Sequence, residues 1–180
     1  MRSLLSAALL AAMLWGLPVS KTSAQTFPST TVIIVVPYPA GGSTDVLARA
    51  LANELSKVWK QSVVIENVGG ASSIIGSNRV ANAAPDGHTL LLTIDPTVVS
   101  NRFLFKKLPY DPDKSLAPIT MLGRSGQLLI AHPSVTAKDV RALVDAARRN
   151  PGGIAYGAYG AGTQPNLLFE TLAEREGVKF

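Results

Sequence analysis

The fold class can be inferred from residues 32–59, VIIVVPYPAGGSTDVLARALANELSKVW. The first five residues of this stretch are β-branched and apolar, which is typical of a strand buried on both faces of a sheet. The large apolar residues that follow recur at spacings of 4, 4 and 3: Leu47, Leu51, Leu55 and Val58. This spacing predicts an amphipathic helix over residues 44–59. A strand, a glycine-containing turn and a helix form the unit from which parallel sheets are built.

The same alternation continues along the chain. Short apolar runs predict strands over residues 62–66 and 89–93, and a helical pattern predicts a second helix over residues 74–84. Strands that alternate with helices indicate a largely parallel sheet. The predicted fold class is therefore α/β, with residues 25–98 as its first lobe.

The pattern changes after residue 98. Prolines recur among aromatic residues over residues 99–118, which predicts a long segment that crosses to a second lobe, residues 119–180. The elements expected in that lobe are strands over 119–122, 128–131 and 154–156, a helix over about 137–149 capped by residues 134–136, and a helix over about 166–176. Three strands are too few for the usual sheet, so we expect this lobe to be incomplete in this chain.

Residues 1–24 have the features of a secretory signal peptide. Arg2 precedes an apolar run over residues 4–17, and small residues at 22–24 provide a cleavage site. The alternative is a membrane anchor, but the run has 14 residues, whereas a membrane-spanning helix needs about 20. We therefore expect an exported chain that has no membrane span once the signal is removed.

Composition and charge exclude several classes of function. Without the signal the chain has 15 basic and 12 acidic residues, a net charge of +3 that is too mild and too scattered for nucleic-acid binding. The absence of cysteine excludes thiol catalysis, and two histidines, His88 and His132, are too few for a histidine-rich zinc site. A serine hydrolase is an alternative, but the chain lacks the Gly-x-Ser-x-Gly motif. We expect neither enzyme activity nor a cofactor.

Residues 37–45, PYPAGGSTD, are the most distinctive candidate site. Two glycines allow the backbone to approach a ligand closely, and Ser43 or Thr44 can cap the following helix. The amides of the first helical turn carry the positive end of the helix dipole, which predicts an anion-binding site at the carboxyl edge of the sheet. The alternative is a plain capped turn in which Asp45 favours the dipole and pairs with Arg49.

Residues 156–165, YGAYGAGTQP, form a second loop of similar composition before a predicted helix. Three glycines permit close approach, Thr163 and Gln164 can donate hydrogen bonds, and Tyr159 can wall a pocket. Neither loop has the Gly-Lys-Ser/Thr ending or the glycine spacing of a nucleotide-binding loop. Two such loops on two lobes suggest a clamp, and a flexible glycine turn is the alternative for the second loop.

Six segments of the chain occur in a characteristic order: PYPAGGSTDVLARAL (37–51), VVIEN (63–67), ANAAPDGHTLLL (81–92), KKLPYDPDKSLAPIT (106–120), HPSVTAKDVRALVDAARRNPG (132–152) and YGAYGAGTQPN (156–166). In this order they resemble the tripartite tricarboxylate transporter receptor family, also called Bug proteins. The resemblance implies a type II periplasmic-binding-protein fold, in which two α/β lobes close on a ligand. It also implies a periplasmic solute receptor that holds a small carboxylate with loop amides and ordered waters, uses no cofactor, and delivers the ligand to two membrane permease subunits.

The resemblance also implies which residues bind the ligand. The family's first-lobe carboxylate loop falls on residues 38–45, its second-lobe glycine loop on residues 159–164, and the loop over residues 94–98 borders the cleft. The ligand-binding residues expected from this are Tyr38, Ala40, Gly41, Gly42, Ser43, Thr44, Asp45, Asp95, Tyr159, Ala161, Gly162, Thr163 and Gln164.

The sequence departs from the family pattern in two respects. Where the family often has Gly-Ala-Gly-Gly, this chain has GGASS at residues 69–73, which adds hydroxyl groups near the cleft. Family members are also longer than this chain. The alternative function is therefore a truncated receptor product that does not transport and whose incomplete sheet exposes an unpaired edge.

Overall fold

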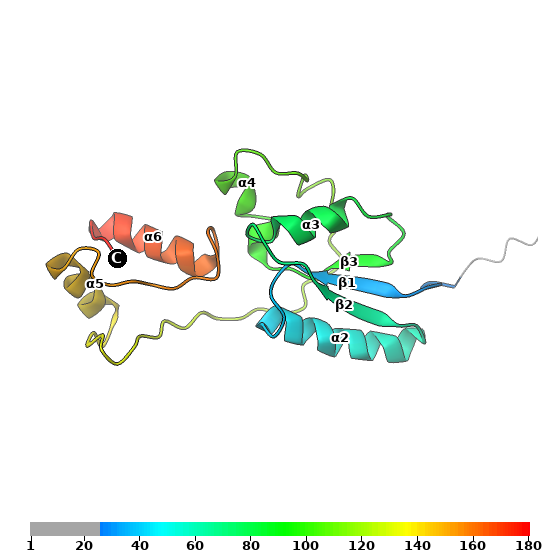
Figure 1. The fold of residues 1–180 in the computed structure, drawn as a ribbon, viewed down its shortest axis with the longest axis horizontal. Coiled ribbons are helices and arrows are strands. Elements are labelled where there is room, and N and C mark those ends of the chain that lie inside the picture. Colours follow the sequence, from blue (N-terminus) through cyan, green and yellow to red (C-terminus); the bar gives the residue numbers. More distant parts are fainter. Residues whose placement is uncertain (1–25) are drawn as a thin grey trace, which may run out of the picture.

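The structure, a computed structural model, describes residues 26–180, so the predicted signal peptide lies outside the described residues. The first part of the chain contains a parallel sheet of three strands, β1 (Val32–Val36), β2 (Val63–Asn67) and β3 (Thr89–Leu91), in the order β2-β1-β3 (Figure 1). The central residue Ile34 pairs with Ile65 on one side and with Leu90 on the other. The predicted α/β class with a parallel sheet is therefore confirmed.

Helices cover both faces of this sheet. Helix α2 (Ser43–Trp59) lies on one face and helix α3 (Ile74–Ala81) on the other (Figure 1). The core between α2 and the sheet consists of Ile34, Val36, Ala48, Ala52 and Leu92. The apolar face of α2 is therefore not the one predicted from the large residues. The small side chains of α2 face the sheet most directly, while Leu47 and Val58 are exposed.

The segment after β3 contains two short elements that the sequence did not predict. A 3₁₀ turn, η1 (Asp95–Thr97), is followed by the single-turn helix α4 (Asn101–Leu104). Tyr110 fastens the rest of the segment to η1, because its hydroxyl donates to the carbonyl oxygen of Thr97 over 2.9 Å. This part of the predicted crossing segment therefore packs on η1. We call residues 26–118 the sheet unit.

The last part of the chain, residues 139–180, is a pair of helices, which we call the helical unit. Helix α5 (Val140–Arg149) and helix α6 (Gln164–Glu176) lie side by side (Figure 1). Arg148 joins them through an ion pair with Glu176 at 2.8 Å, and the ring of Tyr156 stacks on that of Phe169 with 4.3 Å between centroids. The N-cap of α5 is Asp139, which accepts from the amide of Ala142, so the predicted cap at residues 134–136 is wrong.

The three strands predicted after residue 118 do not form in the structure. Residues 119–122, 128–131 and 154–156 have no regular secondary structure, and Leu128 and Ile130 are 91% and 86% exposed. A strand is stable only when a neighbouring strand satisfies its amides and carbonyls, and no described strand lies beside these residues. An apolar composition alone therefore does not produce strands here.

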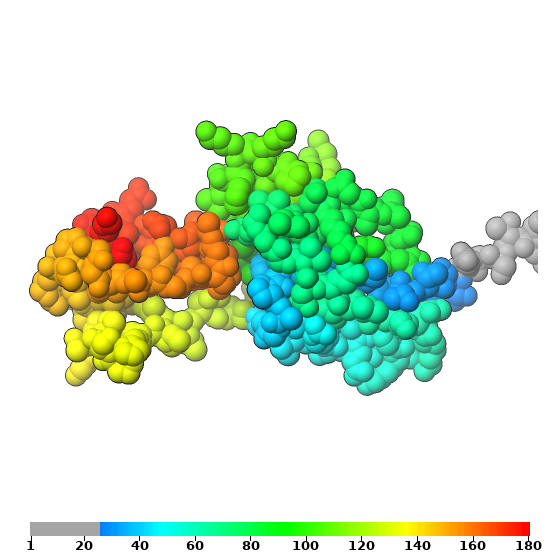
Figure 2. Space-filling view, in the orientation of Figure 1, coloured from blue at the N-terminus to red at the C-terminus, as the bar shows by residue number. Residues whose placement is uncertain are grey.

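The two units meet at the N-terminal end of α6. Figure 2 shows this end of the helical unit, in orange, against the sheet unit, while the joining segment, residues 119–138, runs along one side. No helix among residues 26–180 combines the length and the apolar composition that a bilayer span requires.

Candidate functional site

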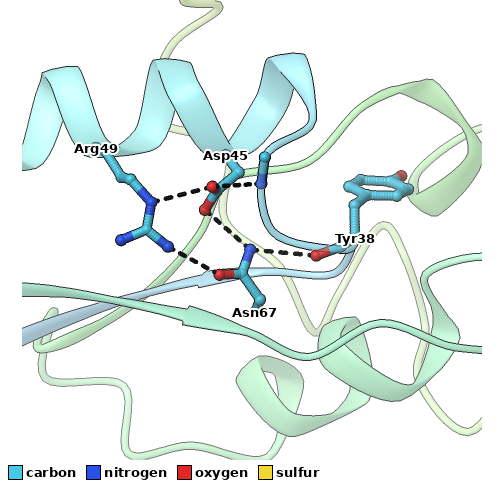
Figure 3. Close-up of polar contacts among 5 residues, drawn as sticks. Tyr38, Asp45, Arg49 and Asn67 are labelled. Carbon is cyan, nitrogen blue, oxygen red and sulfur yellow. Dashed lines mark hydrogen bonds and ion pairs between the residues drawn. The ribbon is translucent and has the colours of Figure 1, made fainter.

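The loop after β1 is held by a buried carboxylate. Asp45 is 2% exposed, and its Oδ2 accepts from the amide of Gly41 at 2.8 Å and from Nε of Arg49 at 3.0 Å (Figure 3). Its Oδ1 accepts from Nδ2 of Asn67 at 3.0 Å. These three donors, Arg49 foremost, lower the pKa of Asp45 from its usual 3.8 to about 2. The side chain of Asp45 is therefore ionised and used within the loop itself.

Asn67 joins this network from the end of the neighbouring strand. Its Nδ2 also donates to the carbonyl oxygen of Tyr38 at 3.2 Å, and its Oδ1 accepts from Arg49 at 3.1 Å (Figure 3). Asn67 thus fixes the backbone at Tyr38. Sequence reasoning missed it, although it ends β2 and the carboxyl ends of parallel strands meet at one edge of a sheet.

The N-terminus of α2 has no side-chain cap, so the predicted capping by Ser43 or Thr44 is wrong. The N-cap is Gly42, and the carboxylate of Asp45 reaches back past it to Gly41. Within the described residues, the amides of Gly42, Ser43 and Thr44 have no hydrogen-bond acceptor. Three backbone donors therefore remain available at the positive end of the helix dipole. The predicted pairing of Asp45 with Arg49 is confirmed.

The second loop is built like the first. The amide of Gly162 donates to Oδ1 of Asn166 at 2.8 Å, as the amide of Gly41 donates to Asp45 four residues further on. Both glycines have positive φ, 85° at Gly41 and 71° at Gly162, which is why glycine stands there. A repeated glycine with an Asp or Asn four residues later was the signal that could have identified Asn166 as a loop-positioning residue.

Thr163 is buried at the start of α6. It is the N-cap of the helix, and its hydroxyl donates to the carbonyl oxygen of Gly160 at 2.6 Å. The hydroxyl proton is therefore used inside the loop, and the oxygen remains an acceptor.

A cavity of about 260 Å³ lies where the two loops approach each other. Residues from both units line it, and none of them is charged: Pro37, Tyr38, Pro39, Gly70, Ala71, Ser72, Ser73, Pro96, Tyr159 and Thr163. Of the predicted site residues, Tyr38, Tyr159 and Thr163 meet here. Burial, and then the nearby charge of Asp95, raise the pKa of Tyr159, so this phenol is neutral at pH 7 and can donate a hydrogen bond.

The other predicted residues lie outside this cavity. Asp95 and Gln164 border a second, more apolar cavity of about 610 Å³ along α6. Seven predicted residues line neither cavity: Ala40, Gly41, Gly42, Ser43, Thr44, Ala161 and Gly162. Asp45 is also absent from both, because its carboxylate is held inside the first loop.

Buried hydroxyl groups contact the residues that line the cavity. Thr97 is in contact with Thr93 at 2.6 Å and with Ser73 at 2.7 Å, measured between hydroxyl oxygens. The hydroxyl of Tyr38 lies 3.4 Å from that of Thr93. The aromatic wall of the cavity is thereby tied to a fixed polar layer. Within residues 26–180, no three acidic or histidine side chains gather where they could share a metal ion.

Ligand pockets commonly lie between two units of a chain and at the carboxyl edge of an α/β sheet, so the position of this cavity fits a ligand-binding protein. The model of the tripartite tricarboxylate transporter family receptor matches residues 47–180. The chain belongs to this family.

Individual relatives agree with this assignment. The chain is 35% identical over 173 residues to the UPF0065 protein in the tcbD-tcbE intergenic region of Pseudomonas sp. (strain P51), an alignment that covers 94% of this chain and 51% of that protein. The structure is similar to R. palustris Rpa4515 with adipate, with a TM-score of 0.81 and 32% identity over 86% of this chain and 52% of the other. It is also similar to the periplasmic binding protein BugD, with a TM-score of 0.68 and 28% identity over 86% and 51% of the two chains. The chain thus spans about half the length of these relatives.

Proposed function

We propose that this chain is the ligand-binding part of a periplasmic solute receptor that captures a small carboxylate between its sheet unit and its helical unit. The observation that carries the proposal is the cavity lined by Tyr38 from the first loop and by Tyr159 and Thr163 from the second. Its volume of about 260 Å³ is close to the lower end of the range of about 300–1,000 Å³ found for ligand pockets, which favours a small solute.

The backbone supplies the charge complementarity in this proposal. The free amides of Gly42, Ser43 and Thr44 begin three residues after Pro39, which lines the cavity. A hydrogen bond to a charged group contributes about 1.5–3 kcal/mol, so three such bonds contribute about 4.5–9 kcal/mol. Because association itself costs free energy, contacts with the cavity walls must add to these bonds to reach the ~8 kcal/mol of micromolar binding. An anion held by amides needs no lysine or arginine.

The predicted residues take distinct roles in this arrangement. Tyr38 and Tyr159 wall the cavity, and Asp95 lies directly before Pro96, another of its lining residues. The first loop binds the carboxylate through the free amides of residues 42–44, while Asp45 accepts from the amide of Gly41 and holds the loop in its conformation. The second loop closes on the ligand through residues 161–164.

Export and delivery complete the proposal. Family membership supports a receptor that passes its ligand to two membrane permease subunits of a tripartite tricarboxylate-type transporter, and the signal-like sequence at residues 1–24 supports transfer to the periplasm. Secretion should yield a product that begins at Gln25. N-terminal sequencing that finds Met1 on the exported protein would contradict this step.

Calorimetric titration tests the binding step. Adipate, the compound that accompanies R. palustris Rpa4515 in its structure, should bind in the micromolar range. Its neutral diamide, adipamide, should bind at least tenfold more weakly because it lacks the charge that strengthens each amide contact. A panel of other di- and tricarboxylates should be titrated in parallel, since the ligand depends on the lining side chains. If no carboxylate in the panel binds, or if the diamide binds equally well, the proposal is wrong.

A further inference from the structure

The loop between β2 and α3, which lines the cavity, has an unusual backbone. Three successive residues that are not glycine lie in the left-handed region, with φ of 45° at Ala71, 51° at Ser72 and 75° at Ser73. Residues with a Cβ avoid this region, and glycine adopts it without cost. The two serines thus occupy positions where the backbone conformation favours glycine.

Contacts with α4 and η1 hold this loop in its conformation. The buried side chain of Asn101 donates from Nδ2 to the carbonyl oxygen of Ser72 at 2.8 Å. The hydroxyl of Ser73 lies 2.7 Å from that of Thr97, inside the buried hydroxyl layer. The backbone at Ser72 is therefore supported by the sheet unit, while its side chain points away from that support.

The hydroxyl of Ser72 reaches the other unit. It donates to the carbonyl oxygen of Ala161 at 3.0 Å, and a Cβ on the neighbouring Gly160 would lie 3.5 Å from the Ser72 hydroxyl oxygen. Among the described residues, no other direct hydrogen bond joins the sheet unit to the helical unit. A second contact between the units is apolar. The side chain of Leu104 lies so close to the backbone of Gly162 that a Cβ on this glycine would overlap Cδ1 of Leu104.

We propose that Ser72 is a positioning residue that docks the second glycine loop onto the cavity and sets the equilibrium between the docked and separated arrangements of the two units. The docking is a property of the chain without ligand. Its consequence for binding rests on the proposed function.

The size of the effect follows from the kind of bond. A hydrogen bond between neutral groups shifts an equilibrium by about two- to tenfold. Removing the hydroxyl should lower the ratio of docked to separated molecules by that factor. The apparent affinity for a ligand that needs both loops should fall when the docked arrangement becomes rarer.

Distance measurement between spin labels tests the docking directly. The chain contains no cysteine, so Val58→Cys on α2 and Glu174→Cys on α6, both exposed positions, accept one label each without a competing thiol. In the ligand-free chain, Ser72→Ala and Ser72→Gly should both move the distance distribution toward longer and broader values. Ser72→Asn, which tolerates a left-handed backbone and supplies a new donor, should restore part of the docked population.

A matched control separates the hydroxyl from the backbone. Ala71→Gly relieves a left-handed residue in the same loop but leaves the Ser72 hydroxyl in place, so it should not change the distance distribution. Ser72→Gly relieves the backbone as well, so it should fold even if Ser72→Ala does not. If neither Ser72 variant changes the distance, or if Ala71→Gly changes it equally, the inference is overturned.

Titration with adipate then distinguishes the two proposals. If the distances respond as expected and adipate and the other carboxylates fail to bind, the docking role stands and the proposed function fails. If adipate binds the parent and the Ser72→Ala variant equally while the distances are unchanged, the function stands and the docking role fails.

Discussion

Replacing Gly42 with valine should weaken carboxylate binding without disturbing the fold. Gly42 has an ordinary extended conformation, with φ of −73° and ψ of 166°. A Cβ added there would meet the carbonyl oxygen of Pro39 at 3.6 Å, an ordinary van der Waals distance. The loss of a favourable N-cap residue and the lower entropy of the unfolded chain act in opposite directions, so the free energy of unfolding should change by less than about 1 kcal/mol.

The effect on binding is larger because the new side chain stands beside the free amides of the first loop. Losing one charge-assisted hydrogen bond costs about 1.5–3 kcal/mol, which corresponds to a rise in the Kd for adipate of roughly 10- to 150-fold. Calorimetric titration gives the Kd, and urea unfolding followed by circular dichroism gives the stability.

A matched control is available in the joining segment. A Cβ on Gly123 would meet nothing within 4 Å, so Gly123→Val makes the same replacement away from both loops and should leave the Kd unchanged. If Gly42→Val binds adipate as tightly as the parent does, the first loop does not hold the carboxylate.

Two further predictions concern stability. Asp45→Asn should destabilise the chain near neutral pH, because the folded state lowers the pKa of Asp45 from 3.8 to about 2. This stabilisation is present above about pH 4 and is lost as the pH falls toward 2, so the urea midpoints of parent and variant should converge in that window. A difference between the midpoints that stays constant with pH would contradict the role of Asp45. Gly76→Ala should lower the free energy of unfolding by about 1–3 kcal/mol. The new Cβ would lie 2.8 Å from Cβ of Pro37 and 2.5 Å from the carbonyl oxygen of Val68. An unchanged urea midpoint would show that α3 can move away from β1.

The sheet unit could be predicted from the sequence because its signals are local. The apolar run of β1 and the helical spacing in α2 lie within one continuous stretch, and each pattern favours one kind of element. The stripe on α2 was misplaced because large residues determined the prediction, whereas the packing places Ala48 and Ala52 against the sheet.

The strands expected after residue 118 show the limit of local patterns. The residues at 128–131 have the composition of a strand, but a strand also needs a neighbour, and composition does not reveal whether the neighbour is present. The same limit explains why η1 and α4 were missed, since the packing of Tyr110 against Thr97 is not visible in a proline-rich sequence.

The site was predicted in outline but not in its internal contacts. The two glycine loops were found from their composition, and Tyr38, Tyr159 and Thr163 do line one cavity. The acceptor for Gly41 could not be chosen from sequence, because Ser43, Thr44 and Asp45 can all serve near a helix N-terminus. Asn67 comes from another strand, so its role depends on how the sheet is assembled.

In the proposed binding mode, both glycine loops hold one carboxylate between them. Backbone amide chemical shifts of the ¹⁵N-labelled chain, followed during titration with adipate, test it most directly. We expect that amides in residues 42–44 and in residues 161–164 shift together and report the same Kd. Shifts confined to one loop, or found only along the apolar face of α6, would contradict it.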